Sequence, residues 1–316
     1  MPHNELTQLI DLLPTGVEVL AREAIGGSGS NRRYWRLTLS TGKSLIATAG
    51  TNLKENEAFM YLAYKLAKAG VRVPRIVGVT VDGMGYLQTD VGHQALFDDL
   101  SRRDIIIKSI RLLARAQSAP DIDYSRCYPV AEMTPRSVMW DLNYFKYCFL
   151  KTCPGLEFDE SALEDDFEEL TRIISTAEPR GFMVRDFQSR NIMIGKDNEP
   201  WLIDFQGGRF GPAHYDVASF LWQARARFSP ELRSEMIALY CRERNLKESA
   251  FRATLRYFVV FRLMQALGAY GFRGRFERKE HFLKSIEPAV ASLRQEIEQI
   301  PDLPALRSII ADPHFC

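Results

Sequence analysis

Two short segments of the sequence, residues 184–191 and 202–206, hold the residues best suited to chemistry. In them, Asn191 follows Asp186 by five residues, and Asp204 follows Asp186 by eighteen. Phosphoryl transfer needs a carboxylate that orients and deprotonates an attacking hydroxyl, and hard oxygen ligands that hold Mg²⁺ across the phosphates of a nucleotide. A loop with Asp at its start and Asn at its end, followed by a second Asp, provides all three side chains.

Short apolar runs on both sides of this loop indicate the strands that position it. Residues 182–184 and 191–194 have strand character, a turn follows at 196–198, and residues 200–204 form another apolar run. An isolated Asp in a turn usually binds nearby backbone amides. The joint spacing of Asp186, Asn191 and Asp204 between strands favours a chemical role over that alternative.

The N-terminal quarter predicts a small antiparallel sheet with one helix. Residues 34–39 and 44–49 have hairpin spacing around a turn at 40–42, and strand character returns at 73–79 and 85–89. Between them, Asn52 and Glu55 form a capping signal, and apolar residues recur at helical period until Gly70.

The rest of the chain is mostly helical in pattern, at residues 104–116, 141–150, 161–175 and almost everywhere after Asp216. The apolar run at 257–272 is interrupted by Arg262 and Gln265 and is short for a bilayer, so it predicts a core helix. We therefore expect an α+β fold with two lobes: residues 1–90 as a small sheet lobe and residues 91–316 as a larger helical lobe.

Composition excludes several classes of protein. With 46% hydrophobic and 26% charged residues, the 316-residue chain has the balance of a folded globular protein. A net charge of +1 provides no field for nucleic acid. Five scattered cysteines fit neither a disulfide framework nor a zinc site, and the N-terminus lacks the pattern of a secretory signal. We expect a cytoplasmic protein without nucleic-acid or membrane partners.

The motif segments at residues 30–36, 185–191, 203–206, 211–219 and 267–270 resemble those of a known family. This is the aminoglycoside phosphotransferase and choline kinase-like branch of the protein-kinase fold, whose catalytic loop reads H-x-D-x-x-x-x-N and whose metal Asp ends a strand reading I-D-[FW]. Within it, the chain is similar to bacterial kinases that phosphorylate the anomeric hydroxyl of N-acetylmuramate and N-acetylglucosamine, from about residue 20 to about residue 295.

The resemblance implies a role for each residue that matches the family motif. Asp186 is the expected catalytic base, Asn191 and Asp204 are the expected Mg²⁺ ligands, and Asp216 is expected to brace the catalytic loop from the following helix. Taken without the resemblance, Asp216 opens an apolar helix, where a capping role also suffices. The first lobe is expected to bind ATP, and the second to carry the catalytic loop and the acceptor site.

Three further segments are expected to contact the nucleotide. Small residues ahead of a strand let backbone amides approach phosphate oxygens, although Gly/Ser clusters are usually plain loops. The segment at residues 88–92 resembles the family hinge, whose backbone contacts adenine. The simpler interpretation is a linker between the lobes, and the two interpretations are compatible. Arg33 belongs to a group with Arg32 and Arg36 that either neutralises phosphate or forms a solvated strand face. The nucleotide-contacting residues expected here are Gly27, Ser28, Gly29, Ser30, Arg33, Gln88 and Asp90.

The chain departs from the family pattern at two positions. The strand at residues 45–49 has no nucleotide-binding Lys, and Val184 replaces the usual His of the loop. Glu55 is the expected helix Glu, because apolar residues follow it at helical spacing and place it on the buried side. Its partner is Lys54 or an Arg between residues 32 and 36, and the sequence leaves this choice open.

The spacing of Asp186, Asn191 and Asp204 and the resemblance together predict an ATP- and Mg²⁺-dependent kinase, and the resemblance implies the anomeric hydroxyl of an N-acetylated amino sugar as its acceptor. One alternative is a kinase of another small hydroxyl compound such as an aminoglycoside, which predicts an acidic acceptor pocket. A second alternative is a non-catalytic pseudokinase, suggested by the missing Lys and His. A basic group in the C-terminal region suits an anionic sugar or is an exposed face: Arg262, Arg273, Arg275, Arg278 and Lys279.

Overall fold

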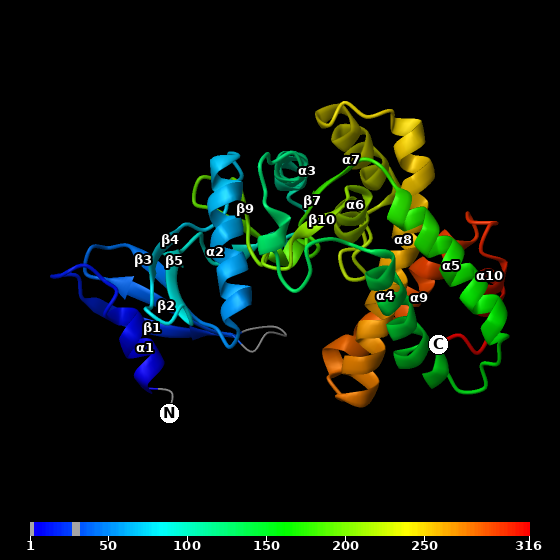
Figure 1. Cartoon of the computed structure of the whole chain (residues 1–316), viewed down its shortest axis with the longest axis horizontal. Coiled ribbons are helices and arrows are strands. Elements are labelled where there is room, and N and C mark those ends of the chain that lie inside the picture. The colour runs from blue at the N-terminus through cyan, green and yellow to red at the C-terminus, as the bar shows by residue number, and fades with distance from the viewer. Residues whose placement is uncertain (1–2, 27–31) are drawn as a thin grey trace. The chain divides into compact units, whose positions relative to one another are not determined.

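The computed structural model describes residues 3–26 and 32–316 of the chain (Figure 1). These residues form two compact units. The first unit contains Met1–Ala131 and Arg190–Arg209, and the second contains Glu132–Ser189 and Phe210–Cys316. The division into lobes at residue 90 stays a prediction, since the compact units also group residues 91–131 and 190–209 with the N-terminal sheet.

A five-stranded antiparallel sheet organises the first unit, with strand order β1-β2-β3-β5-β4. The predicted hairpin is confirmed, since Leu37 of β2 pairs with Leu45 of β3. The strand β1, which has no clear signal in the sequence, pairs along β2 at the edge of the sheet. The strands are β1 (Val19–Ile25), β2 (Arg33–Leu39), β3 (Ser44–Ala49), β4 (Ile76–Val79) and β5 (Gly85–Thr89).

Alternation along the strands gives this sheet two different faces. Leu37, Ala47 and Leu87 pack with Leu9 of helix α1 (His3–Ile10) in a buried apolar cluster. Helix α2 (Leu53–Lys68) contacts the other face, where its Phe59 stacks on Tyr86 with ring centroids 5.2 Å apart. The predicted helix start is confirmed, because the Asn52 side chain accepts a hydrogen bond from the Glu55 amide.

A second, three-stranded sheet in the first unit carries part of the predicted motif. It has the order β6-β8-β9, and the pair of Ile192 with Leu202 sets the register of β8 and β9. Helix α3 (Arg103–Gln117) contacts β9. The strands are β6 (Gln94–Ala95), β8 (Ile192–Ile194) and β9 (Pro200–Leu202).

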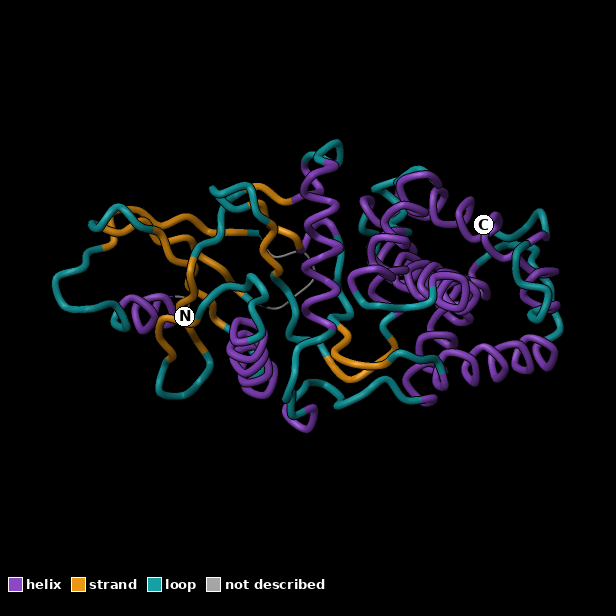
Figure 2. Tube along the Cα trace, turned by 90° about the horizontal axis from the view of Figure 1, so that it is seen from above, coloured by secondary structure: helices purple, strands orange, loops and turns teal. Residues whose placement is uncertain are grey.

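The second unit is almost entirely helical, as Figure 2 shows in purple. Its long helix α8 packs against α4, α6 and α9, and buried aromatic side chains such as Phe145, Phe258 and Phe261 fill the space around it. A short ladder of β7 (Arg180–Met183) and β10 (Arg209–Pro212) precedes α6. The helices are α4 (Pro135–Cys148), α5 (Glu160–Thr176), α6 (His214–Leu221), α7 (Pro230–Glu243), α8 (Glu248–Tyr270), α9 (Glu280–Ile297) and α10 (Pro304–Ala311).

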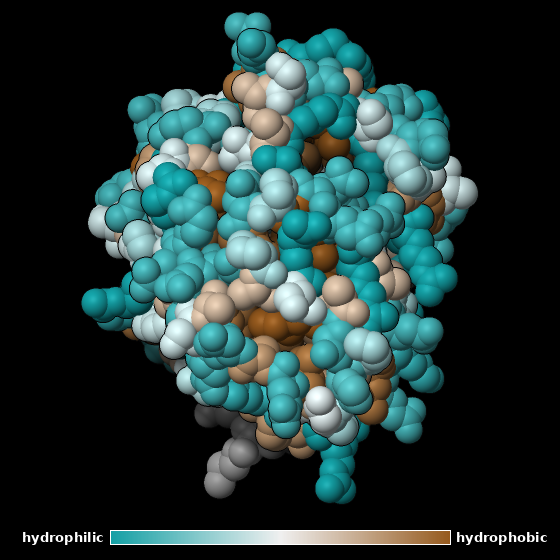
Figure 3. All heavy atoms as spheres, turned by 90° about the vertical axis from the view of Figure 1, so that its right-hand side faces the viewer, coloured by the Kyte–Doolittle hydropathy of each residue, from teal (hydrophilic) through white to brown (hydrophobic). Residues whose placement is uncertain are grey.

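The α+β fold predicted from the sequence is confirmed, with differences in detail. Helix α4 begins six residues before the predicted start, because Thr134 caps it and Pro135 occupies its first turn. A π-helical segment, Gly271–Phe276, continues α8 beyond the predicted core helix. Within residues 3–26 and 32–316, none of the helices combines the length and apolar character needed to cross a bilayer. The face of the molecule drawn in Figure 3 is mostly hydrophilic.

Candidate active site

The turn from β9 brings Asp204 next to Asn191 at the start of β8. The Ile203 amide donates to the Asn191 carbonyl at 3.0 Å, which continues the pairing of the two strands past Leu202. As a result the Asn191 side-chain amide donates to Asp204 Oδ2 at 3.3 Å. The two predicted metal ligands, thirteen residues apart in the chain, therefore lie side by side in the first unit.

Asp204 has an unusual backbone conformation, with φ at 60°. This left-handed region is costly for a residue with a Cβ, and such positions are concentrated at functional sites. The next residue, Phe205, is buried and stacks on Phe59 of α2 with ring centroids 4.8 Å apart. Gln206 Nε2 donates to Asp204 Oδ1 at 2.9 Å. Packing of Phe205 and hydrogen bonds from Asn191 and Gln206 thus hold the carboxylate in place.

Arg32 supplies the partner of Glu55 that the sequence left open. Its guanidinium lies 3.4 Å from Glu55 Oε1, and only 3% of the Arg32 side chain is exposed. The same guanidinium lies 5.9 Å from the centroid of the Phe59 ring. A buried cation in contact with the helix Glu is the arrangement that the missing strand Lys provides in kinases.

Tyr34 feels the charges of both this ion pair and the predicted metal ligand Asp204. Burial raises the pKa of the Tyr34 hydroxyl, while the Arg32 charge lowers it and the Asp204 charge raises it. Tyr34 is therefore within electrostatic reach of both Arg32 and Asp204. The sequence gives no separate signal for Tyr34, because a tyrosine in a strand is an ordinary residue.

Arg33 does not lie with these residues. It forms an ion pair with Glu5 of α1, on the sheet face that α1 covers, and its side chain is 46% exposed. Side chains of neighbouring residues in a strand point to opposite faces of the sheet. Arg32 and Tyr34 therefore lie on the face that carries Glu55, and Arg33 lies on the other face. Arg33 as a nucleotide contact stays a prediction, and this geometry favours Arg32 as the basic residue beside Glu55.

The segment after β5 is held by an ion pair within the first unit. Asp90, whose side chain is 3% exposed, accepts from Arg36 Nε at 2.7 Å and from the Ser44 hydroxyl at 2.7 Å. Burial alone raises the pKa of the Asp90 carboxyl, but the hydrogen bonds from Arg36 and Ser44 hold it below its usual value. Arg36 also donates to the Gly92 carbonyl at 3.0 Å. The hydrogen bonds of the Asp90 carboxylate are thus taken up within the protein. The backbone groups of this segment remain available to contact an adenine ring.

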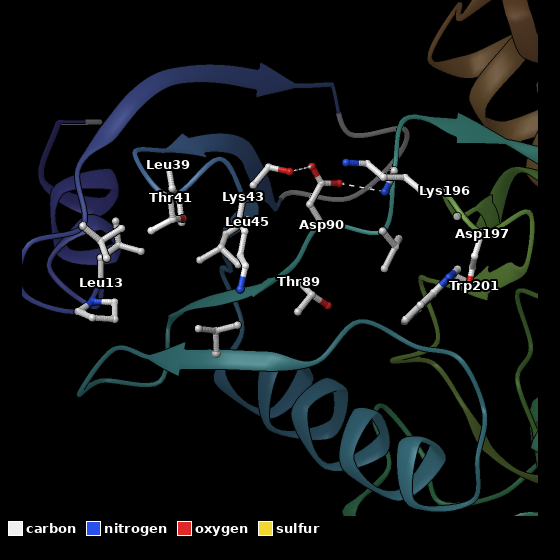
Figure 4. A pocket seen from close by; sticks show the side chains of 17 residues that line it. Leu13, Leu39, Thr41, Lys43, Leu45, Thr89, Asp90, Lys196, Asp197 and Trp201 are labelled. Atoms are coloured by element: carbon white, nitrogen blue, oxygen red, sulfur yellow. Dashed lines mark hydrogen bonds between the residues drawn. The ribbon is translucent and has the colours of Figure 1, made fainter.

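Gln88 and the glycine-rich loop complete the predicted nucleotide contacts. Gln88 is buried in β5 and pairs with Ile46 of β3 and Ile76 of β4. Gly27, Ser28, Gly29 and Ser30 lie outside the described residues. A cavity of about 720 Å³ lies beside Asp90. Figure 4 shows the side chains that line it, Leu39, Leu45 and Trp201 among them.

The catalytic-loop segment with Asp186 belongs to the second unit, where Asp216 holds it. Asp216 is completely buried, and its two carboxylate oxygens accept from the Val184 and Arg185 amides at 2.8 Å each. Asp216 lies in the first turn of α6 after the N-cap residue Ala213, and these two bonds run to the loop rather than to its own helix. The role of Asp216 as a brace stays a prediction, and these two bonds, which tie the loop to α6, favour it over a helix cap.

Arg185, just before Asp186, is constrained at its backbone and its side chain. Its φ is 74°, again in the left-handed region. Burial lowers the pKa of the Arg185 guanidinium, but the Tyr215 hydroxyl and the Asp186 and Asp141 carboxylates more than offset this and raise it. Asp186 therefore stands next to a fixed positive charge.

The basic residues of the C-terminal region are mostly engaged within the second unit. Arg262 donates to Gln265 and to Ser219, and Arg275 donates to Thr152 and to the Cys316 carbonyl. Lys279 pairs with Glu277, and the Arg273 guanidinium lies over the Phe282 ring. These contacts give most of the group a structural use, so the group carries little weight as a site for an anionic sugar.

Residues 22–252 match the phosphotransferase enzyme family. The chain belongs to this family, and it is a phosphotransferase that acts on a hydroxyl group. The pseudokinase alternative is therefore set aside.

Two bacterial relatives are called N-acetylmuramate/N-acetylglucosamine kinase. The one from Pseudomonas aeruginosa is 28% identical over 207 residues, which cover 63% of this chain and 60% of that protein's length. The one from Neisseria meningitidis is 22% identical over 297 residues, which cover 89% of this chain and 87% of that protein.

Solved structures of similar fold agree with the family. A choline/ethanolamine kinase family protein from Mesorhizobium loti has a TM-score of 0.67 at 14% identity, covering 98% of this chain and 99% of its own. LicA in complex with AMP has a TM-score of 0.61 at 14% identity, covering 92% of this chain and 96% of its own. At these identities the likeness shows the fold alone.

Proposed function

We propose that the protein is an ATP- and Mg²⁺-dependent kinase that phosphorylates the anomeric hydroxyl of an N-acetylated amino sugar of the N-acetylmuramate or N-acetylglucosamine type. The observation that carries the acceptor class is the match to the Neisseria meningitidis kinase of that name across 89% of this chain. Membership of the phosphotransferase enzyme family supports the transfer chemistry.

In this proposal, Asn191 and Asp204 hold Mg²⁺. A side-chain amide oxygen and a carboxylate are hard donors. Asn191 Nδ2 donates to Asp204 Oδ2 at 3.3 Å, so the amide would turn its oxygen toward the carboxylate to share one small cation. Among the described residues there is no cluster of three or more His, Cys, Asp or Glu side chains that could hold a metal ion. Mg²⁺ commonly uses one or two protein ligands with substrate phosphates and water, so this pair is sufficient. When bound, the ion neutralises charge on the nucleotide phosphates.

Arg32 and Glu55 take the place of the missing Lys–Glu pair in this proposal. Arg32 is buried, permanently charged and fixed by Glu55 3.4 Å away, so it can face a phosphate without a large entropy cost. The backbone of the segment at Asp90 meets the adenine, because the Asp90 carboxylate is already bonded to Arg36 and Ser44.

Asp186 orients the acceptor hydroxyl and accepts its proton. The anomeric hydroxyl of a free sugar is more acidic than an ordinary alcohol, so it places a smaller demand on the base. This suits a loop in which Val184 stands where the family has His. Asp216 binds the amides just before Asp186, which keeps the base in position.

The test uses the wild-type protein with ATP, Mg²⁺ and N-acetylmuramate or N-acetylglucosamine. We expect an acid-labile sugar 1-phosphate whose ³¹P signal couples to the anomeric proton. The methyl glycoside of the same sugar, which lacks the free anomeric hydroxyl, is the matched control and should not react. Equal rates for the free sugar and its glycoside would place the phosphate on another hydroxyl. No product from either sugar, with turnover of an aminoglycoside instead, would overturn the acceptor class.

A further inference from the structure

A chain of polar contacts in the second unit leads from helix α8 to the residue before Asp186. Gln265, in α8, accepts a hydrogen bond from the Tyr215 hydroxyl at 2.7 Å. Its Nε2 donates to Asp141 Oδ2 of α4 at 2.5 Å. Gln265 therefore joins α4, α6 and α8 through one side chain.

Arg185 lies against this chain of contacts. The Tyr215 hydroxyl, through a side-chain hydrogen bond, and the charges of the Asp141 and Asp186 carboxylates raise the pKa of its guanidinium, so all three groups lie within electrostatic reach of it. One half-buried cation thus interacts electrostatically with two carboxylates, the first bonded to Gln265 and the second the proposed base. The backbone amide of Arg185 donates at 2.8 Å to Asp216, the residue after Tyr215 in α6, so the same helix contacts both Gln265 and the loop.

An amide of this length satisfies all three of the hydrogen-bond partners of Gln265 named here. Its oxygen accepts from Tyr215 and from Arg262, and its nitrogen donates to Asp141. A carboxylate in its place would repel Asp141, and an apolar side chain would leave the Tyr215 hydroxyl, on a residue that is 2% exposed, without that acceptor. In either case Asp141 loses the hydrogen bond from Gln265 that holds its carboxylate. The carboxylate can then move and compete with Asp186 for the Arg185 charge.

We propose that Gln265 is a positioning residue of the catalytic loop, which acts through Tyr215, Asp141 and Arg185 to hold Asp186 in its reactive orientation. The inference rests on the proposed function for the role of Asp186 as base, while the positioning itself is a property of the second unit. It gives α8 a part in catalysis although Gln265 is 79 residues from Asp186 in the sequence.

The first test measures the loop without turnover, by hydrogen–deuterium exchange of the peptide that covers residues 182–190. Gln265→Leu should speed exchange of the Val184 and Arg185 amides by about tenfold, because local opening of the loop becomes easier. The matched control is Arg256→Leu, which removes α8 hydrogen bonds to the Gln299 carbonyl and the Tyr257 hydroxyl. It should leave this peptide unchanged. Equal exchange in wild type and Gln265→Leu would overturn the proposal, even if no sugar were ever phosphorylated.

The second test is a double-mutant cycle on turnover, with whichever hydroxyl acceptor the wild type phosphorylates. Gln265→Leu should lower kcat by about tenfold with the KM for ATP unchanged, and it should have no further effect in an Arg185→Leu background, as expected when one residue acts through the other. Gln265→Glu, which keeps the size of the side chain, should show the same coupling if the Leu variant does not fold. Independent, multiplying losses in the double variant would contradict a path through Arg185.

Discussion

Asp204 in the first compact unit and Asp216 in the second differ in burial and in hydrogen-bond partners. This difference distinguishes a carboxylate that is able to bind a ligand from one that holds the backbone of a loop. Asp216 is completely buried, and both its oxygens accept from backbone amides at 2.8 Å. Asp204 is partly exposed, and its oxygens accept from the neutral side chains of Asn191 and Gln206 at 3.3 and 2.9 Å. Side-chain amides can rotate away or offer their own oxygens, whereas backbone amides cannot. Asp204 can therefore exchange partners for a cation, and Asp216 cannot do so without releasing the loop.

The largest expected effect comes from Asp204→Asn. Losing one of the two proposed metal ligands and its charge should abolish turnover at ordinary Mg²⁺, a fall of roughly 10³ or more in kcat. Calorimetry should show that Mg²⁺ no longer strengthens ATP binding, while the melting temperature stays near that of the wild type. Normal turnover, or tight ATP binding in chelator, would contradict the metal role.

Asp186→Asn should lower kcat by roughly 10², the scale for loss of a general base. Because Asn keeps the size of the side chain, ATP affinity and the melting temperature should stay nearly unchanged. Steady-state kinetics with nucleotide titration measures both quantities. An unchanged kcat would move the base to another residue.

Asp216→Ala should act mainly on stability, the reverse of Asp204→Asn. It leaves the Val184 and Arg185 amides without their acceptor, which costs about 2 to 3 kcal/mol of the free energy of unfolding. Urea denaturation measures this loss, and Asp216→Asn, which keeps one acceptor oxygen, should lose less. If Asp216→Ala unfolds at the same urea concentration as the wild type, the brace is not structural.

The smallest expected effect concerns His214, two residues before Asp216. Its ring stacks between Phe251 and Phe258, with centroid distances of 4.1 and 5.1 Å, and burial lowers its pKa from 6.5 to about 3. In the part of the chain that the structure describes, neither ring nitrogen has a hydrogen-bond partner. Between pH 6.5 and 3 the unfolded state therefore binds a proton that the folded state does not, so stability falls as pH falls.

His214→Phe should remove this pH dependence. Between pH 7.5 and 5 the wild type should lose about 2 kcal/mol more of its free energy of unfolding than the variant, since carboxylates titrate alike in both. Urea denaturation at the two pH values gives the difference. If the wild type and the variant lose the same free energy of unfolding between pH 7.5 and 5, His214 is protonated in the folded protein at pH 5.

Local features of the fold could be predicted because their signals lie within a few residues of one another. The β2–β3 hairpin follows from strand alternation around a turn, and the start of α2 follows from Asn52 and its bond to the Glu55 amide. The proximity of Asn191 and Asp204 could also be predicted locally, because the two residues flank the short hairpin of β8 and β9. Strand β10 and the π-helical segment had no such local signal, because pairing with β7 and packing beside α9 stabilise them.

The sequence by itself determined which residues are able to do chemistry, and the tertiary structure decided which of them meet. The spacing of Asp186, Asn191 and Asp204 can be read directly from the sequence. In contrast, Arg32 rather than Arg33 pairs with Glu55 because the two arginines lie on opposite faces of the sheet. The contact between Gln265 and Asp141 spans 124 residues. Hydrogen bonds within a turn or helix follow from neighbouring residues, whereas contacts of this length form only when burial of apolar faces brings distant elements together.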